Sequence, residues 1–211
     1  MPKSSKGKGV TLIELLIAII LIFVVIMGLS SIDIFSRTHL IGSSRRSLLQ
    51  NELSHSLEHM SKNVVQASGN QLSSVNQPIQ VLTNGFSVRV DPLQTPQDLG
   101  DDLVYSYTLS GNRLSVACAQ ADPAHAAPAA CPTGANTALS NHINPGFSNS
   151  VMPENALPTS GFYVNLTANG TTVEVGLVAK FRPSASSADI STDNPQIQMK
   201  NQMQSRNVSS R

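Results

Sequence analysis

Hydrophobic residues are distributed unevenly along the chain, and the first pattern is one long apolar run. From Val10 to Leu29 the only charged side chain is Glu14. Twenty residues of helix at about 1.5 Å each extend for about 30 Å, which is the thickness of a bilayer's hydrocarbon core. We therefore predict a transmembrane or assembly helix over residues 10–35.

The next pattern has helical periodicity. Leu49, Leu53, Leu57, Met60 and Val64 recur every three or four residues and form one apolar stripe. This stripe predicts that the helix continues, now amphipathic, over residues 36–68, with Gly69 as its C-cap. Gly28, Ser30 and Ser31 are candidates for loosening the helix after the apolar run.

After Gly69 the pattern changes to short segments in which apolar and polar residues alternate. Such segments, separated by turn residues such as Asn-Gly, predict antiparallel hairpins. We expect strands at 78–82 with 86–90, at 103–109 with 114–116, and at 162–166 with 173–181, and an edge strand within 196–203. Residues 117–160 and 182–195 are expected to be irregular. The predicted fold class is α+β, with the long helix packed on an antiparallel sheet in a β-rich head of residues 69–211.

The first nine residues differ from the rest of the chain in their charge. Lys3, Lys6 and Lys8 make a basic leader over residues 1–9 that contains no acid. Removing these three from the 14 basic residues leaves 11, against 13 acidic residues, and those that remain are scattered. Nucleic-acid binders cluster their positive charge and add stacking aromatics. A nucleic-acid partner is therefore not expected.

Two cysteines, Cys118 and Cys131, flank a stretch rich in Ala and Pro. Their spacing matches no zinc knuckle, and no second pair would complete four ligands. A disulfide is favoured if this region is extracytoplasmic, and two free buried thiols are the alternative.

Two ordinary interpretations of the N-terminus explain less than the sequence contains. A signal peptide would have a shorter apolar region ending in a small-x-small cleavage site. A simple anchor explains the length of the run but not Glu14, because a carboxylate in a lipid-facing helix costs about 2.5–3.5 kcal/mol.

The segment G-V-T-L-I-E-L-L, from Gly9 to Leu16, follows the basic leader and opens the apolar run. It resembles the processing motif of the type IV pilin superfamily, which includes type IV pilins and the pseudopilins of type II secretion. The resemblance is sharp from Pro2 to about Leu29, extends in character but not in motif through the following helix, and is only architectural over the rest. Val10 is a departure, because most relatives have Phe at that position.

The resemblance implies a non-enzymatic filament subunit. A prepilin peptidase and methyltransferase would cut after Gly9 and methylate Val10, and Glu14 would pair with the new N-terminal amine of a neighbouring subunit. Other pilin or pseudopilin subunits would be the partners. The chain would cross the inner membrane once, with a cytoplasmic N-terminus and a periplasmic head, and would join an extracytoplasmic filament after assembly.

The finer subfamily and the role of the head stay open at this stage. Major pilins of the family that this segment resembles often carry a proline that breaks the helix, and no proline interrupts it here before Pro78. The resemblance therefore favours a minor subunit, either a J-type minor pseudopilin or a W-type minor pilin. The alternative is a tip-exposed adhesin, or a module that binds a secreted substrate or DNA, with residues 117–160 carrying the recognition.

Catalytic and metal-binding motifs are scarce. His55, Glu58 and His59 match H-x-x-E-H, the signature of one class of zinc proteases. No third ligand follows, and the helix that carries the motif is predicted to pack in an assembly. His125 and His142 lie in loops and are expected to face solvent. We expect no enzyme activity, no cofactor and no bound metal.

Overall fold

The computed structural model describes residues 10–70, 77–95, 98–122, 131, 136–154, 159–167, 170–183, 191, 193–205 and 207–209. Within these described residues, one helix, α1 (Leu12–Val65), is followed by eleven strands. These are β1 (Ser68–Asn70), β2 (Ile79–Leu82), β3 (Gly85–Val90), β4 (Leu103–Ser110), β5 (Arg113–Gln120), β6 (Thr137–Ser140), β7 (Phe147–Ser148), β8 (Phe162–Leu166), β9 (Thr172–Lys180), β10 (Gln196–Gln204) and β11 (Asn207–Ser209). The α+β fold class is confirmed.

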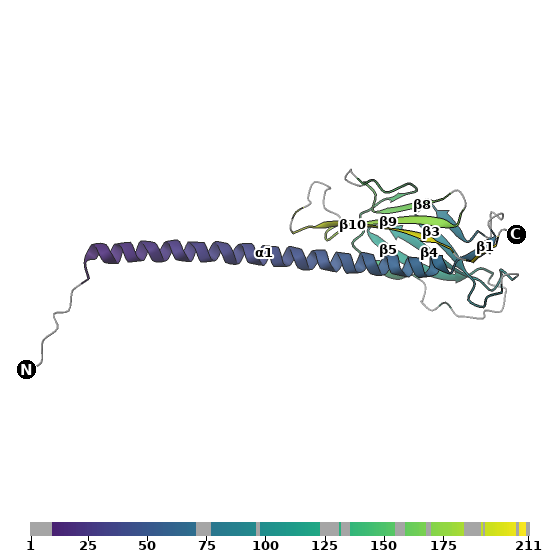
Figure 1. Cartoon of the computed structure of the whole chain (residues 1–211), viewed down its shortest axis with the longest axis horizontal. Helices are drawn as coiled ribbons and strands as arrows, with labels where there is room; N and C mark the ends of the chain where they lie inside the picture. Colours follow the sequence, from purple (N-terminus) through teal and green to yellow (C-terminus); the bar gives the residue numbers. More distant parts are fainter. Residues whose placement is uncertain are drawn as a thin grey trace, which may run out of the picture.

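Helix α1 is the axis of the molecule. It has 54 residues, so it is about 80 Å long at the usual rise per residue. Its first half projects as a bare stalk, and its second half lies against the head (Figure 1). The helix continues through Gly28, Ser30 and Ser31 without a break. The predicted loosening produces no break, although both serine hydroxyls bond back to carbonyls one turn earlier, at 2.9 Å, a contact that slightly weakens a helix.

The end of α1 also differs from the prediction. The helix stops at Val65 with Gln66 as its C-cap, while Gly69 lies in strand β1. Tertiary contacts determine where the helix ends. Ala67 is fully buried, forms an antiparallel bridge to Val90, and its carbonyl accepts a 2.7 Å hydrogen bond from Ser205 Oγ. The chain is therefore drawn into strand pairing before it reaches the glycine.

The predicted hairpins are confirmed, but the strands divide into two larger sheets instead of one. The first sheet has the order β2-β3-β4-β5-β6, and the second has the order β10-β9-β8-β7. A small third sheet joins β1 to β11. Strand β10 is an edge strand, as predicted. Two pairings, β7 with β8 and β1 with β11, are parallel.

Two glycines shape the hairpins of the first sheet. A Cβ on Gly85 would lie 1.8 Å from the Tyr107 carbonyl oxygen of the neighbouring strand, so only glycine fits at this point of β3. Gly111, in the turn between β4 and β5, has a φ of +61°. That left-handed conformation is strained for other residues.

One hydrophobic core joins the helix to both sheets. The predicted stripe from Leu49 to Val64 is buried, and it packs with inward residues of β2–β5 and β8–β10. In β4 the four alternating residues Leu103, Tyr105, Tyr107 and Leu109 are buried, as their pattern predicted. Phe86 links the sheets, because it stacks on Tyr107 with ring centroids 5.0 Å apart and contacts Phe162 at 6.2 Å.

The stretch predicted to be irregular, residues 117–160, contributes more to the fold than its composition indicates. It contains the second half of β5, all of β6 and β7, and a bridge from Ile143 to Ala179. Met152 covers the outer face of β9, where a Cβ on Gly176 would lie 2.5 Å from its sulfur. The second sheet is therefore partly covered on both faces.

Cys118 and Cys131 lie at disulfide distance, with Cα atoms 5.6 Å apart. This separation is in the normal range for a disulfide. The bond ties strand β5 to the far end of the loop that follows it, and both residues pack against the core.

The buried stripe of α1 should carry much of the stability of the head. Leu53 is completely buried, so Leu53→Ala should lower the free energy of unfolding by about 2–5 kcal/mol through lost burial and a residual cavity. Leu48 is 43% exposed on the same helix, and Leu48→Ala should change it by less than about 0.5 kcal/mol. Denaturant unfolding of the full chain in detergent, followed by near-UV tyrosine signals, compares the two. Equal losses would show that the stripe does not anchor the head.

Candidate functional site

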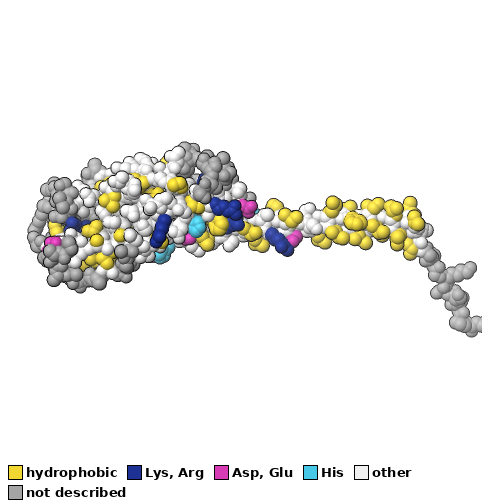
Figure 2. All heavy atoms as spheres, turned by 180° about the vertical axis from the view of Figure 1, so that it is seen from behind, with side chains coloured by type: hydrophobic (Ala, Val, Ile, Leu, Met, Phe, Trp, Pro, Cys, Tyr) yellow, Lys and Arg dark blue, Asp and Glu magenta, His cyan; other side chains and the backbone are white. Residues whose placement is uncertain are grey.

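The first half of α1 is the most unusual surface of the molecule. Every residue from Val10 to Ile41 is exposed, and Gly42 is the first buried residue of the helix. Leu12 is 83% exposed and Met27 is 72% exposed. Figure 2 shows this stalk as an almost continuous hydrophobic surface, with charged groups where it approaches the head. One segment of α1 is long and apolar enough to cross a membrane, and none of that segment is buried within the chain.

The first turn of α1 is closed by a capping box between Thr11 and Glu14. The Thr11 hydroxyl accepts a hydrogen bond from the Glu14 amide at 3.3 Å, and Glu14 Oε2 accepts bonds from the Thr11 amide and hydroxyl, both at 2.9 Å. Reciprocal bonds of this kind satisfy two backbone donors that a helix start leaves unpaired. Glu14 Oε1 is bonded to nothing among the described residues.

This cap gives Glu14 hydrogen-bond partners within its own chain, although neutral donors do not balance its charge. The sequence signal was present as T-L-I-E, because a threonine followed three residues later by glutamate is the pattern of a capping box. Val10, which precedes the cap, is 74% exposed. Gly9 and the rest of the leader lie outside the described residues.

After Glu14, the next charged residues of α1 lie beyond the apolar run. Asp33 and Arg37 form an ion pair one turn apart, at 3.0 Å, and both side chains are largely exposed. Exposed pairs of this kind contribute only a few tenths of a kcal/mol. Their position still marks the level at which the stalk becomes compatible with water or lipid headgroups.

The helix meets the head through a cluster of polar and aromatic side chains. The Arg45 guanidinium lies 4.6 Å from the centroid of the Phe181 ring, and the same ring stacks on His142 at 5.7 Å. Glu52 Oε2 accepts a 2.7 Å bond from the Ser140 hydroxyl and lies 3.0 Å from His142 Nδ1. His142 is therefore half-buried and paired, not solvent-facing as predicted.

This cluster does not have the geometry of a nucleophile with its base. The Ser140 hydroxyl bonds to Glu52, and it accepts a bond from the backbone amide of His142 at 3.1 Å. The arrangement instead fixes the helix against the end of β6. His125 lies outside the described residues.

A second polar cluster lies deeper, around Tyr107. Its hydroxyl accepts a 2.7 Å bond from Asn63 Nδ2 and lies 2.9 Å from His59 Nδ1. Burial raises the pKa of Tyr107, despite the bond from Asn63. The pKa of His59 is lowered, mainly by burial and further by the charges of His55 and Lys62. A neutral His59 is therefore favoured beside the hydroxyl.

The two histidines of the H-x-x-E-H motif lie in different surroundings. His59 turns toward the core and bonds to Tyr107, while His55 is exposed. Among the described residues, His55, Glu58 and His59 do not converge as a metal-binding group. The sequence did not reveal that His59 is a half-buried hydrogen-bond partner, because polarity alone does not show which side chain a residue contacts.

Removing the Tyr107 hydroxyl should weaken the joint between helix and head. Tyr107→Phe leaves the buried Asn63 side chain without its partner, so the free energy of unfolding should fall by about 1–3 kcal/mol. Tyr105, two residues earlier on the same face of β4, makes no side-chain hydrogen bond within the described residues. Tyr105→Phe is the matched control and should be close to neutral. Chemical denaturation of both variants measures the free energy of unfolding, and equal losses of stability in the two would contradict a role for the Tyr107 hydroxyl.

Comparisons with protein-family models, with curated proteins and with solved structures find no match for this chain. The functional argument therefore depends on the residues and their geometry.

Proposed function

We propose that this chain is a structural subunit of a type IV pilin-like filament, either a J-type minor pseudopilin or a W-type minor pilin. Residues 10–35 anchor it in the inner membrane and later pack against neighbouring subunits. A prepilin peptidase removes the leader after Gly9, and Val10 becomes the methylated N-terminus. The support comes from the motif between Gly9 and Leu16 together with one long apolar helix carrying an antiparallel head.

The observation that carries the proposal is the length of the exposed apolar stalk. The run from Val10 to Leu29 already spans about 30 Å of hydrocarbon. Beyond it, five large apolar side chains stay exposed, and nothing within the described chain covers them: Ile32, Ile34, Phe35, Leu40 and Ile41. They extend the apolar surface by more than ten residues past the bilayer core. A simple membrane anchor has no use for this extension, whereas a bundle of parallel helices would bury it.

The expected topology places the head outside the cytoplasm. Lysines 3, 6 and 8 precede the apolar run and favour a cytoplasmic N-terminus, although arginines also follow the run. The cysteine pair at disulfide distance supports an oxidising compartment for the head. The two features agree on a single-pass arrangement with a periplasmic head.

Within this proposal the two carboxylate oxygens of Glu14 have different roles. Oε2 closes the first turn of its own helix with Thr11, while Oε1 has no partner among the described residues. A neighbour displaced along the helix axis would bring its N-terminal ammonium to this second oxygen. Opposite charges attract strongly in apolar surroundings, and each is costly there alone. The pair would therefore set the axial register of adjacent helices.

The first test is the position of cleavage. In a host that carries a prepilin peptidase, the membrane-extracted protein should begin at Val10 and carry one added methyl group, measured by N-terminal sequencing and intact mass. Gly9→Val should abolish processing, because the resemblance makes Gly9 the last leader residue. Gly7→Val changes the other nearby leader glycine and should be cut normally. A protein that starts at Met1, or after residue 29, would refute the assignment.

The second test separates the role of Glu14 as a helix cap from its proposed role in aligning neighbouring subunits. Glu14→Gln keeps a side chain that can cap the helix but removes the charge, whereas Glu14→Ala removes both. Disulfide cross-linking between cysteine-tagged stalks in the membrane should fall at least about tenfold in both variants, which corresponds to a loss of only ~1.4 kcal/mol. Membrane insertion and cleavage after Gly9 should persist.

Thr11→Ala is the control for the cap, because it removes the threonine hydroxyl and leaves the carboxylate charged. It should reduce cross-linking much less than Glu14→Gln. If Glu14→Gln assembles like the wild type while Thr11→Ala and Glu14→Ala fail, Glu14 acts only as a helix cap and the register hypothesis is wrong.

A further inference from the structure

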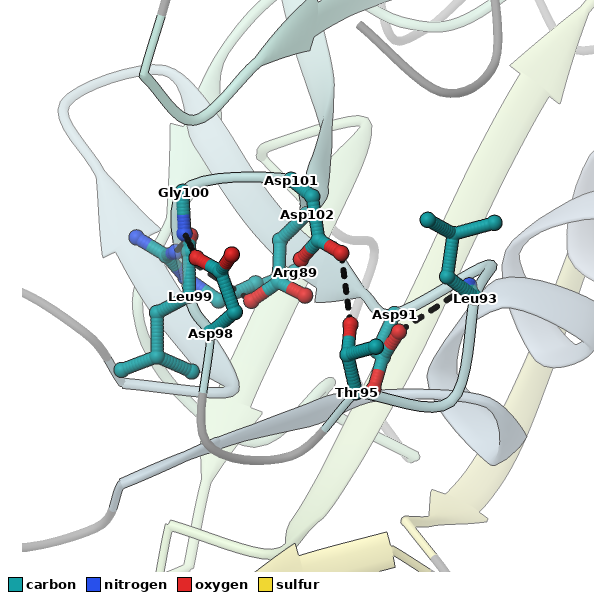
Figure 3. Close-up of polar contacts among 9 residues, drawn as sticks. All are labelled: Arg89, Asp91, Leu93, Thr95, Asp98, Leu99, Gly100, Asp101 and Asp102. Carbon is teal, nitrogen blue, oxygen red and sulfur yellow. Dashed lines mark hydrogen bonds and ion pairs between the residues drawn. The ribbon is translucent and has the colours of Figure 1, made fainter. Parts of the chain in front are cut away.

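A group of acidic residues lies where the loop between β3 and β4 begins and ends. Asp91 directly follows β3, and Asp101 and Asp102 directly precede β4. Val90 pairs with Leu103 in the antiparallel register, so the next positions along the two strands, Asp91 and Asp102, are brought together. Figure 3 shows the three carboxyl groups gathered on one side of the loop, with Thr95 beside them.

Two of these carboxylates are deeply buried and only half satisfied. Asp101 is 4% exposed and Asp102 is fully buried. Thr95 Oγ1 donates to Asp101 Oδ2 at 2.5 Å, and Arg89 Nη1 contacts Asp102 Oδ2 at 3.3 Å. The other oxygen, Oδ1, is buried in both residues and has no hydrogen-bond donor among the described residues. Buried polar atoms are normally paired, so two unpaired carboxylate oxygens in one cluster indicate a missing positive partner.

Arg89 supplies only part of the positive charge that this cluster requires. Three carboxylates face one guanidinium, and Arg89 Nη1 also donates to the Leu99 carbonyl at 2.8 Å. Asp91 Oδ1 accepts one bond, from the Leu93 amide at 3.0 Å, which does not change its charge. With all three carboxylates ionised the cluster keeps a formal excess of two negative charges, the charge that one divalent cation neutralises.

We propose that Asp91, Asp101 and Asp102 bind a calcium ion. Each contributes one oxygen, and the three oxygens lie within 4.8 Å of one another. Oxygens on opposite sides of Ca²⁺ are about 4.6–5.2 Å apart, because Ca–O distances are 2.3–2.6 Å. Mg²⁺ binds at 2.0–2.1 Å and demands near-ideal octahedral geometry, whereas Ca²⁺ accepts irregular sets of oxygen ligands, so this cluster suits Ca²⁺ better. Loop carbonyls and water would complete the coordination sphere of calcium.

Such an ion would stabilise the end of the head where α1 terminates. It would hold both ends of the β3–β4 loop at one point. That point lies one residue from Val90, which bridges Ala67 just after α1 ends. The inference concerns the head alone and does not depend on the proposed assembly of the stalk.

The test uses the full chain in detergent micelles, freed of divalent ions with EDTA and then titrated with CaCl2. Isothermal titration calorimetry should show one site per chain. The Tm should rise by about 5–10 °C at a Ca²⁺ concentration 100 times the Kd. MgCl2 at the same concentration should raise it much less. Asp91→Asn should abolish the heat and the Tm shift. It is the mildest ligand variant, because Asp91 is half-buried and asparagine can still accept the Leu93 bond.

Asp98→Asn is the matched control. It removes one negative charge from the same loop, but Asp98 does not belong to the converging group, so its Ca²⁺ affinity should stay within about threefold of the wild type. Should Asp91→Asn fail to fold, Asp91→Glu replaces it and should bind calcium at least tenfold more weakly. The proposal is overturned by a wild-type chain without a one-to-one calcium heat, by an equal response to Mg²⁺ or to NaCl of matched ionic strength, or by normal calcium binding in the Asp91 variant.

Discussion

The structure depends on one constraint: a single continuous helix must satisfy two different surroundings. Up to Ile41 its surface is exposed and mostly apolar, and from Gly42 onward one stripe is buried by the head. An isolated helix of this length gains little from intrinsic propensity, and most helical stability in proteins comes from tertiary packing. The buried stripe therefore holds the second half directly. The first half needs lipid or other helices, because the described chain provides no cover for it.

The head is fixed to the helix by more than apolar packing. In one cluster, the Tyr107 hydroxyl accepts a bond from Asn63 and contacts His59, both on the helix. In the other, Glu52, which lies about two helical turns before His59, binds Ser140 and His142 of the head. Apolar contacts alone tolerate sliding, whereas buried hydrogen bonds are directional and costly to leave unmade. These two clusters therefore fix both the rotation and the axial position of the head on the helix. A rigid joint of this kind would transmit the register of the stalk to the surface of the head.

The sequence predicted the elements better than their assembly. The stripe from Leu49 to Val64, the hairpins and the edge strand β10 followed from periodicity, because local packing against one face imposes period 3.6 or 2. The division into two sheets did not follow, because strand partners across long gaps leave no local pattern. The same limit explains why Ile143 and Met152, which cover the second sheet, looked like loop residues. His142 was expected to face solvent, and the contact of His59 was missed, because polarity alone does not reveal a partner such as Glu52 or Tyr107.

The start of the helix shows what local geometry adds to a motif. Taken from the sequence alone, Glu14 is an unpaired carboxylate inside an apolar run and is unfavourable by a few kcal/mol. With Thr11, it becomes part of the helix end itself, because Oε2 replaces backbone partners that the first turn lacks. The partial positive charge at a helix N-terminus stabilises the carboxylate further. In the proposed assembly, a subunit waiting in the membrane can therefore keep Glu14 ionised at a reduced cost. The unpartnered Oε1 then remains as an acceptor for the amine of a neighbouring subunit, and the interaction that satisfies the single chain does not compete with the one that would align two chains.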